Sequence, residues 1–323
     1  MTKSKTLATS LLSLSAAALL AVCGAGGASA APASPQDGAQ VASQSVDSTN
    51  AASYWTPDRM RSAVPGDVLA SKALQRGNTS PAAAVEKGSS TKIAGKAGKG
   101  RTPLHVDENP VSHIGKVFFT LGGSNYVCSG NSVVSNNKST VSTAGHCLNE
   151  GPGAFATNFV FVPAYLDGAA PYGKWAAKAL YAPTQWSSAG DMQYDTGFAV
   201  VSQLNGQNLA DVVGASGVQF NAARGLTYKS FGYPAAAPFD GSSLVSCTGP
   251  ASNDPYNPQF QSQGIPCDMT GGSSGGPWFI GTSSSGFQNS VNSYGYGSRS
   301  EIMYGPYWGS VIQQAYSSAS SAN

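Results

Sequence analysis

The sequence predicts an all-β protein, folded as a sandwich or a barrel, with a single helix at its carboxyl end. From Ile114 onward, short runs rich in Val, Phe, Tyr and Thr alternate with clusters of Gly, Asn, Pro or Ser. Many short strands separated by turn residues are typical of sandwiches and barrels. The expected strands are Ile114–Leu121, Tyr126–Val134, Phe159–Leu166, Phe198–Val201, Leu226–Tyr233 and Pro277–Ile280.

The final segment differs from these runs. From Tyr307 to about Ala319 it contains no internal proline, and it includes Val311, Ile312, Ala315 and Tyr316 at helical spacing. Such spacing predicts one amphipathic helix at the end of the chain.

The charge of the chain argues against nucleic acid as a partner. Eighteen Lys and Arg residues face sixteen Asp and Glu residues, which gives a formal net charge of +2, and charged residues make up only 11% of the chain. No basic stripe with interleaved aromatic residues is present, as a nucleic-acid-binding surface would require.

Residues 1–30 are typical of a secretory signal peptide. Lys3 and Lys5 precede an apolar run from Leu7 to Val22, and the small residues Ala28-Ser29-Ala30 follow. A membrane anchor is the alternative, but the run is short and diluted by serines. Lipidation of Cys23 is a second alternative, and it is disfavoured by the bulk of the preceding valine. We expect export, with cleavage after Ala30 and no membrane attachment afterwards.

Residues 31–110 differ in composition from the rest of the chain. They are rich in Ala, Ser, Gly and Lys, their aromatic residues are Tyr54 and Trp55, and they include the basic, glycine-spaced run from Lys92 to Arg101. This composition predicts a pro-segment with an exposed, protease-sensitive linker. A permanent flexible extension is the alternative. We expect a cut between Arg101 and His113, which leaves a domain over residues 111–323.

Removal of the signal peptide takes away Cys23 and leaves four of the five cysteines: Cys128, Cys147, Cys247 and Cys267. An even number of cysteines in an exported chain predicts disulfides, and four cysteines allow three pairings. Zinc is the alternative, but the chain lacks a CxxC pair and has only three histidines. We expect no metal and no cofactor.

Two short motifs predict the chemistry. Gly271-Gly272-Ser273-Ser274-Gly275-Gly276-Pro277 frames a serine with glycines, and Ser142-Thr143-Ala144-Gly145-His146-Cys147 supplies a histidine upstream. A serine hydroxyl becomes a good nucleophile when a neighbouring base takes its proton. Flanking glycines let backbone N–H groups approach a developing oxyanion.

Together, in this order, the two motifs resemble those of the chymotrypsin-fold serine peptidases. The absence of an acid before the serine is most similar to their secreted bacterial branch, which includes the glutamyl endopeptidases. The resemblance covers roughly the last two thirds of the chain. It implies two antiparallel β-barrels with the active site between them, a C-terminal helix, the disulfides Cys128–Cys147 and Cys247–Cys267, and an oxyanion hole formed by the N–H groups of Gly272 and Ser274.

The predicted catalytic residues are His146, Asp195 and Ser274. Ser273 is the rival nucleophile. His146 is favoured as the base because His105 and His113 fall in or beside the pro-segment. Asp195 stands at the mouth of an expected strand and matches the family pattern for the acid that orients the imidazole.

Asp191 is the competing acid, and either aspartate could instead cap a loop.

The order of the catalytic residues along the chain distinguishes a serine peptidase from an esterase. The motif also fits the GxSxG nucleophile elbow of esterases, but those enzymes need a histidine after the serine, and none follows Ser274.

The expected specificity pocket departs from the family patterns. Its edge strand would include Ser293, Tyr294 and Gly295, and no histidine stands there to meet a glutamate carboxylate. Asp268, six residues before Ser274, reaches the acid position of trypsin-like members when counted without gaps. A loop cap beside the disulfide is the alternative role for Asp268.

The sequence therefore predicts a secreted, monomeric serine endopeptidase. It would act on protein or peptide substrates through an acyl-enzyme, with its own pro-segment as a partner. Because Ser273 replaces the acid that many relatives use to bind a new N-terminus, we expect maturation to remove a covering or folding-assisting segment instead. The alternative function is an inactive binding module with the peptidase fold.

Overall fold

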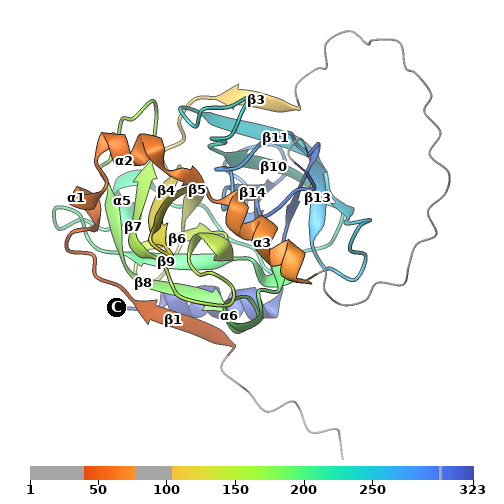
Figure 1. Cartoon of the computed structure of the whole chain (residues 1–323), viewed down its shortest axis with the longest axis horizontal. Coiled ribbons are helices and arrows are strands. Elements are labelled where there is room, and N and C mark those ends of the chain that lie inside the picture. The colour runs from red at the N-terminus through yellow and green to blue at the C-terminus, as the bar shows by residue number, and fades with distance from the viewer. Residues whose placement is uncertain (1–39, 78–103, 298–299) are drawn as a thin grey trace, which may run out of the picture. The chain divides into compact units, whose positions relative to one another are not determined.

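In the computed structural model, which describes residues 40–77, 104–297 and 300–323, the chain from Ile114 onward is mostly β-structure (Figure 1). The predicted signal peptide and the basic run from Lys92 to Arg101 lie outside the described residues. The described residues belong to one compact unit.

Six strands of the first sheet close into a barrel. The order is β8-β7-β4-β5-β6-β9, and a further pairing of β8 with β9 joins the two ends. Strand β1 extends the sheet by pairing with β8, and the short β2 pairs with β5. The strands are β1 (Val41–Ser45), β2 (Val64–Pro65), β4 (Ile114–Leu121), β5 (Ser124–Val133), β6 (Thr140–Thr143), β7 (Thr157–Pro163), β8 (Trp175–Pro183) and β9 (Gly197–Val201).

Strand β4 shows how the sequence specifies this barrel. Val117, Phe119 and Leu121 point to the barrel core, while Phe118 points to the opposite face, which is also buried. Successive side chains of a strand alternate between faces, so a strand buried on both faces reads as a continuous apolar run. The turn to β5 consists of Gly122 and Gly123, both with positive φ, as a tight two-residue hairpin requires.

The chain after β9, together with β3, forms two further antiparallel sheets around one core. The sheet orders are β15-β14-β10-β11-β3 and β12-β13-β16. Side chains from both sheets, including Tyr228, Ile265, Trp278 and Met303, share a buried cluster. The strands are β3 (His105–Glu108), β10 (Thr227–Gly232), β11 (Leu244–Pro250), β12 (Ser252–Asn253), β13 (Gln263–Pro266), β14 (Pro277–Ile280), β15 (Gln288–Val291) and β16 (Ile302–Gly305).

The expected fold class, with its C-terminal helix, is confirmed. Helix α6 (Ser310–Ser320) begins three residues later than the sequence predicts and buries Ile312, Ala315 and Ala319 against the barrel. The two other short helices after the barrel begins are α4 (Thr184–Ala189) and α5 (Leu209–Val213). Of two 3₁₀ turns, Gly145–Cys147 contains His146 and Met192–Tyr194 directly precedes Asp195.

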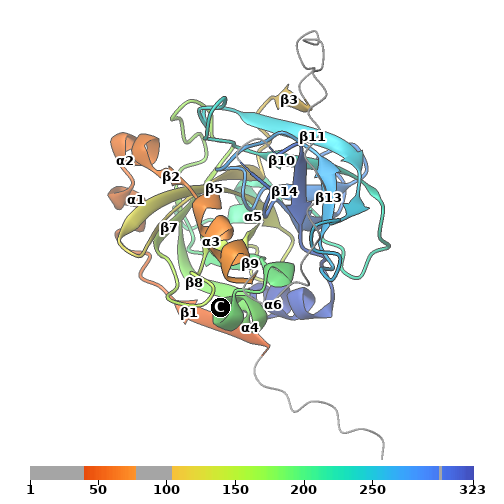
Figure 2. The same ribbon diagram turned by 45° about the vertical axis from the view of Figure 1, so that its right-hand side comes forward.

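The segment before the barrel is folded where it is described. It contains α1 (Ala51–Tyr54), α2 (Pro57–Ser62) and α3 (Asp67–Gly77). Trp55 is fully buried in a cluster with Phe118. In both views α3 lies in front of the region between β5 and β14 (Figures 1 and 2). The weak apolar periodicity of this segment gave no prediction of these helices, because its buried apolar side chains pack against the barrel.

Candidate active site

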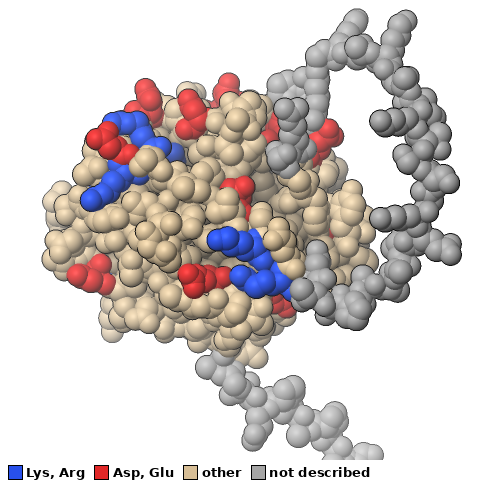
Figure 3. All heavy atoms as spheres, viewed as in Figure 1, with Lys and Arg blue, Asp and Glu red and all other residues tan. Residues whose placement is uncertain are grey.

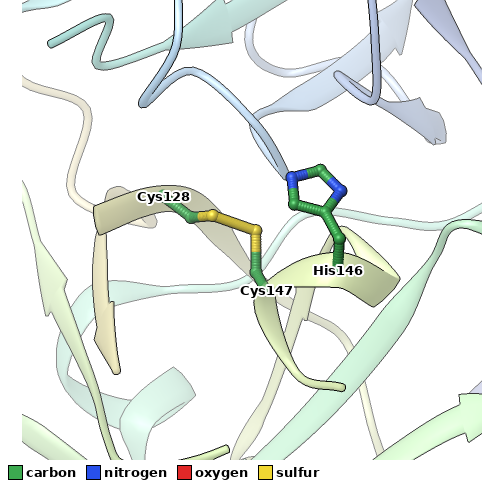
Figure 4. Close-up of side chains that lie close together, drawn as sticks. All are labelled: Cys128, His146 and Cys147. Atoms are coloured by element: carbon green, nitrogen blue, oxygen red, sulfur yellow. A yellow bond between two sulfur atoms is a disulfide. The ribbon is translucent and has the colours of Figure 1, made fainter. Parts of the chain in front are cut away.

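His146 lies in the 3₁₀ turn that follows β6, beside a disulfide. Cys147 is bonded to Cys128 of β5, with 6.4 Å between the Cα atoms (Figure 4). The second disulfide joins Cys247 to Cys267, so both pairings implied by the resemblance are present. The sulfur atoms of Cys128 and Cys147 lie near the His146 ring at metal-ligand spacing. They are bonded to each other, however, and a disulfide offers no thiolate to a metal.

The Asp195 carboxylate makes three hydrogen bonds, two with His146 and one with Ser293. The His146 backbone N–H donates to Asp195 Oδ1 over 2.7 Å, and His146 Nδ1 lies 2.8 Å from Asp195 Oδ2. The Ser293 hydroxyl donates to the same Oδ2 over 2.5 Å. Both partners of the central pair are fully buried. A buried carboxylate with three donors stays where it is placed, and here it fixes the imidazole orientation.

The competing acid has another role. Asp191 precedes the turn Met192–Tyr194, and its side chain accepts the backbone N–H of Gln193. It therefore caps this turn, as the alternative interpretation of a loop aspartate states.

Ser274 stands in a loop shaped by glycines with positive φ. Gly272 has φ of +97° and Gly275 has φ of +81°. A Cβ on Gly275 would lie 2.1 Å from the Thr143 hydroxyl oxygen, so only glycine fits there. Among the described residues, neither the Gly272 N–H nor the Ser274 N–H donates a hydrogen bond. Both N–H groups are therefore free to donate to an oxyanion.

The two serines of the motif differ in their bonding. The Ser273 hydroxyl donates to the Thr270 carbonyl over 2.7 Å and is only 1% exposed. Within the described part of the chain, His146 Nε2 has no hydrogen-bond partner, so a bond to Ser274 is not formed in this state. Such bonds are often long in free enzymes and shorten when substrate binds.

A cleft of about 530 Å³ opens beside Ser274. The predicted wall residues Ser293, Tyr294 and Gly295 line it, and Tyr294 stacks on Tyr304 with ring centroids 5.1 Å apart. The Tyr294 hydroxyl donates to buried Asp254 over 2.9 Å, and burial raises the pKa of Tyr294. The lining residues that come from the chain after residue 104 are all uncharged.

Asp268 does not line this cleft. Its carboxylate accepts the Leu104 backbone N–H over 3.1 Å and lies 2.9 Å from His105 Nδ1. The reason is the neighbouring disulfide: Cys267 is bonded to Cys247 of β11, and β11 pairs with β3 at His105. Counting back from Ser274 without gaps placed Asp268 at the base of the specificity pocket. The pairing of β11 with β3 instead brings Asp268 to β3, where its carboxylate holds the chain at Leu104 and His105.

One acidic residue that the motif search missed does reach the cleft. Asp67, at the start of α3, lines it together with Ser274 and Ser293, and it is the only charged residue among the described lining residues. Burial raises its pKa, and the nearby His146 acts in the opposite direction. The sequence signal was present as Pro65-Gly66-Asp67, an acid directly after a turn and before a helix.

Comparison of the whole structure with solved structures finds the protease Anisep from Arthrobacter nicotinovorans, with 79% sequence identity and a TM-score of 0.67. The match covers 68% of this chain and all of that chain. The chain belongs to the chymotrypsin-fold serine proteases. The thermostable serine protease AL20 from an extremophilic microorganism is 52% identical, with a TM-score of 0.64, over 66% of this chain and 98% of that one.

A third solved structure, a Glu endopeptidase in complex with MPD, shares the fold at 19% identity and a TM-score of 0.55, over 68% of this chain and 98% of that one. A scan against protein-family models found no match, and a comparison with curated proteins found none either. The family assignment therefore stands on the two close structural relatives.

Two properties of the described residues concern nucleic acid and membranes as partners, namely the surface charge and the helices. On the face shown in Figure 3, basic side chains form small separate groups with acidic ones nearby, rather than a continuous stripe. Within the described residues, the helices are all too short or too polar for a membrane crossing.

Proposed function

We propose that this serine protease is a secreted endopeptidase in which Ser274 is the nucleophile, His146 the general base and Asp195 the residue that orients the base. The observation that carries the proposal is the buried contact of His146 Nδ1 with Asp195 Oδ2, because it leaves Nε2 as the ring nitrogen available to Ser274. Export is supported by the two disulfides, which persist in oxidising compartments.

The proposed reaction proceeds through an acyl-enzyme. Ser274 Oγ attacks the scissile carbonyl carbon as His146 Nε2 takes the hydroxyl proton, and the N–H groups of Gly272 and Ser274 receive the oxyanion. Collapse breaks the C–N bond, and Nε2 gives its proton to the leaving amine. Water then attacks the ester by the same route in reverse and frees the second product.

We propose further that residues before the peptidase domain are removed during maturation. The whole chain of the relative Anisep corresponds to 68% of this chain, which leaves about a third of the residues outside the match. The segment 40–77 also covers the cleft, as Asp67 shows. The cleft is therefore open to substrate only after this segment has left it.

Substitution of the two neighbouring serines tests the proposed nucleophile. In the mature enzyme, Ser274→Ala should lower casein hydrolysis by at least about 10³-fold, since loss of a triad member typically costs several orders of magnitude. Ser273→Ala is the matched control and should retain activity, because Ser273 is bonded to Thr270 and not to the base. If Ser274→Ala keeps near wild-type hydrolysis, the assignment is wrong.

A further inference from the structure

The two N–H groups proposed to receive the oxyanion belong to two peptide groups of the nucleophile loop. The Gly272 N–H shares its peptide group with the Gly271 carbonyl. The Ser274 N–H shares its peptide group with the Ser273 carbonyl. In a planar trans peptide the C=O and the N–H point in opposite directions. The hydrogen bonds of these two carbonyls therefore determine where the two N–H groups point.

The first carbonyl is held by a neighbouring loop of the backbone. The N–H groups of Ala235 and Ala236 donate to the Gly271 oxygen over 2.6 and 3.1 Å. A Cβ on Gly272 would lie 2.8 Å from the Ala235 Cβ, so the same loop packs closely against that glycine. Backbone groups supply both hydrogen bonds, and the Gly272 N–H is oriented without help from a polar side chain.

The second carbonyl is held by a side chain, that of Asn292. Its Nδ2 donates to the Ser273 oxygen over 3.0 Å. The Gly276 N–H donates to the same oxygen, also over 3.0 Å. A Cβ on Gly276 would lie 2.8 Å from Asn292 Nδ2, so a glycine is needed for the amide to come this close. The two donors fix the peptide group that carries the Ser274 N–H.

Asn292 is fully buried, and its amide has four hydrogen bonds inside the protein. Nδ2 also donates to the Phe231 carbonyl over 2.9 Å. Oδ1 accepts from the Ser230 hydroxyl over 2.6 Å and from Trp278 Nε1 over 2.7 Å. An indole N–H only donates and a peptide carbonyl only accepts, so these neighbours leave one orientation for the amide. With four partners and no exposure, the amide is held in place and is not available to substrate.

The backbone of Asn292 holds the same loop on the other side of the nucleophile. The Gly275 N–H donates to the Asn292 carbonyl over 2.7 Å, and the Asn292 N–H donates to the Gly276 carbonyl over 2.9 Å. The next residue, Ser293, donates to Asp195. One short stretch after β15 therefore supports both the nucleophile loop and the acid of the proposed triad.

The loop needs such a support because the residue before the nucleophile is not an acid. Ser273 stands there, and its hydroxyl donates to the Thr270 carbonyl, so it offers no carboxylate to a new N-terminus. We propose that Asn292 is a positioning residue for catalysis, whose amide holds the Ser273 carbonyl so that the Ser274 N–H faces the oxyanion. The inference rests on the proposed function, since it needs Ser274 to be the nucleophile.

Asn292→Ala tests this proposal, and Asn289→Ala is its matched control. Asn289 is 2% exposed, and its amide bonds to the Gln219 carbonyl and the Tyr228 hydroxyl, neither of which belongs to the nucleophile loop. Each variant is made as the full chain with a recognition site for a specific protease between residues 92 and 101. Maturation then does not depend on the activity of the variant itself.

The mature enzymes are titrated with a fluorophosphonate probe, and steady-state kinetics on one peptide substrate give KM and kcat per labelled site. We expect Asn292→Ala to lower kcat per labelled site by about 10- to 100-fold, with KM within about twofold of wild type. Loss of a whole oxyanion-hole donor costs about 10²–10³-fold, and here Gly276 still holds the Ser273 carbonyl. The rate of labelling should fall by a similar factor, and Asn289→Ala should keep the wild-type kcat.

Asn292→Leu is the second variant, because leucine has the branched shape of asparagine and removes only the hydrogen bonds. It should show the same loss of kcat, and melting curves identify the variants that are folded. The inference is overturned if folded Asn292→Ala or Asn292→Leu has the wild-type kcat per labelled site, or if Asn289→Ala loses as much. A wild-type enzyme labelled at a residue other than Ser274 would instead contradict the proposed function.

Discussion

The hydrogen bond from Ser293 to Asp195 should contribute measurably to catalysis. The donor and acceptor atoms are 2.5 Å apart, Ser293 is 2% exposed and Asp195 is fully buried. A hydrogen bond to a charged group is worth about 1.5–3 kcal/mol. If the bond acts fully in the transition state, where Asp195 faces a protonated imidazole, Ser293→Ala lowers kcat/KM by about 10- to 150-fold.

The two other hydrogen bonds of Asp195 limit the loss of activity in Ser293→Ala. Asp195 keeps the backbone N–H and the Nδ1 of His146, so the imidazole should retain its orientation. The loss should therefore be smaller than for Ser274→Ala. Steady-state kinetics on a peptide substrate measure kcat and KM separately, and we expect kcat to carry most of the change.

Ser300→Ala provides the control for this prediction. Ser300 lines the same cleft, but its hydroxyl donates to the Ile302 carbonyl and not to Asp195. A thermal melt of each variant separates a catalytic effect from loss of folding. Wild-type kcat/KM for a well-folded Ser293→Ala enzyme would refute the reasoning.

Three further outcomes follow from the structure. In an enzyme that begins before Leu104 and so keeps both partners of Asp268, Asp268→Asn should lower the melting temperature by about 2–4 °C, for about 1 kcal/mol. It should leave an unchanged, non-basic cleavage preference on matched Phe and Arg substrates, and the exposed Asp107→Asn is its control. Trp55→Ala should weaken docking of residues 40–77 by about 3–5 kcal/mol, seen as earlier release of the fragment on a sizing column; co-elution like wild type would contradict this. Burial lowers the pKa of Lys116 to about 8, so unfolding takes up a proton between about pH 8 and the ordinary value, and stability should rise with pH across that window. Melting curves for Lys116→Met should lack this rise, and an unchanged slope would refute it.

Much of the fold could be predicted because individual strands and turns are determined by short stretches of the sequence. The bounds of β4 and β14 match the expected strands, since each is rich in apolar residues and is followed directly by a glycine. The disulfide pairing and the two-barrel topology came from the family resemblance and not from local pattern. The site motifs around His146 and Ser274 could be found because glycines and a cysteine surround each residue in a fixed order.

What the sequence did not predict depends on contacts between distant residues. The place of Asp268 is determined by the pairing of β11 with β3, which joins residues about 140 positions apart and has no local signal. The segment 40–77 has helices too short to be stable alone, and it is ordered by burial of Trp55 against Phe118. Ser293 was expected as a pocket wall, and only the structure shows its bond to Asp195.

The central claim is that Ser274 is the residue acylated by substrate. The most direct measurement is the reaction of the mature enzyme with a fluorophosphonate probe, followed by intact mass and peptide mapping. The account predicts one adduct per chain, located on Ser274, with loss of peptide hydrolysis in proportion to labelling. An adduct on Ser273 or another residue, or an active enzyme that takes up no probe, would contradict it.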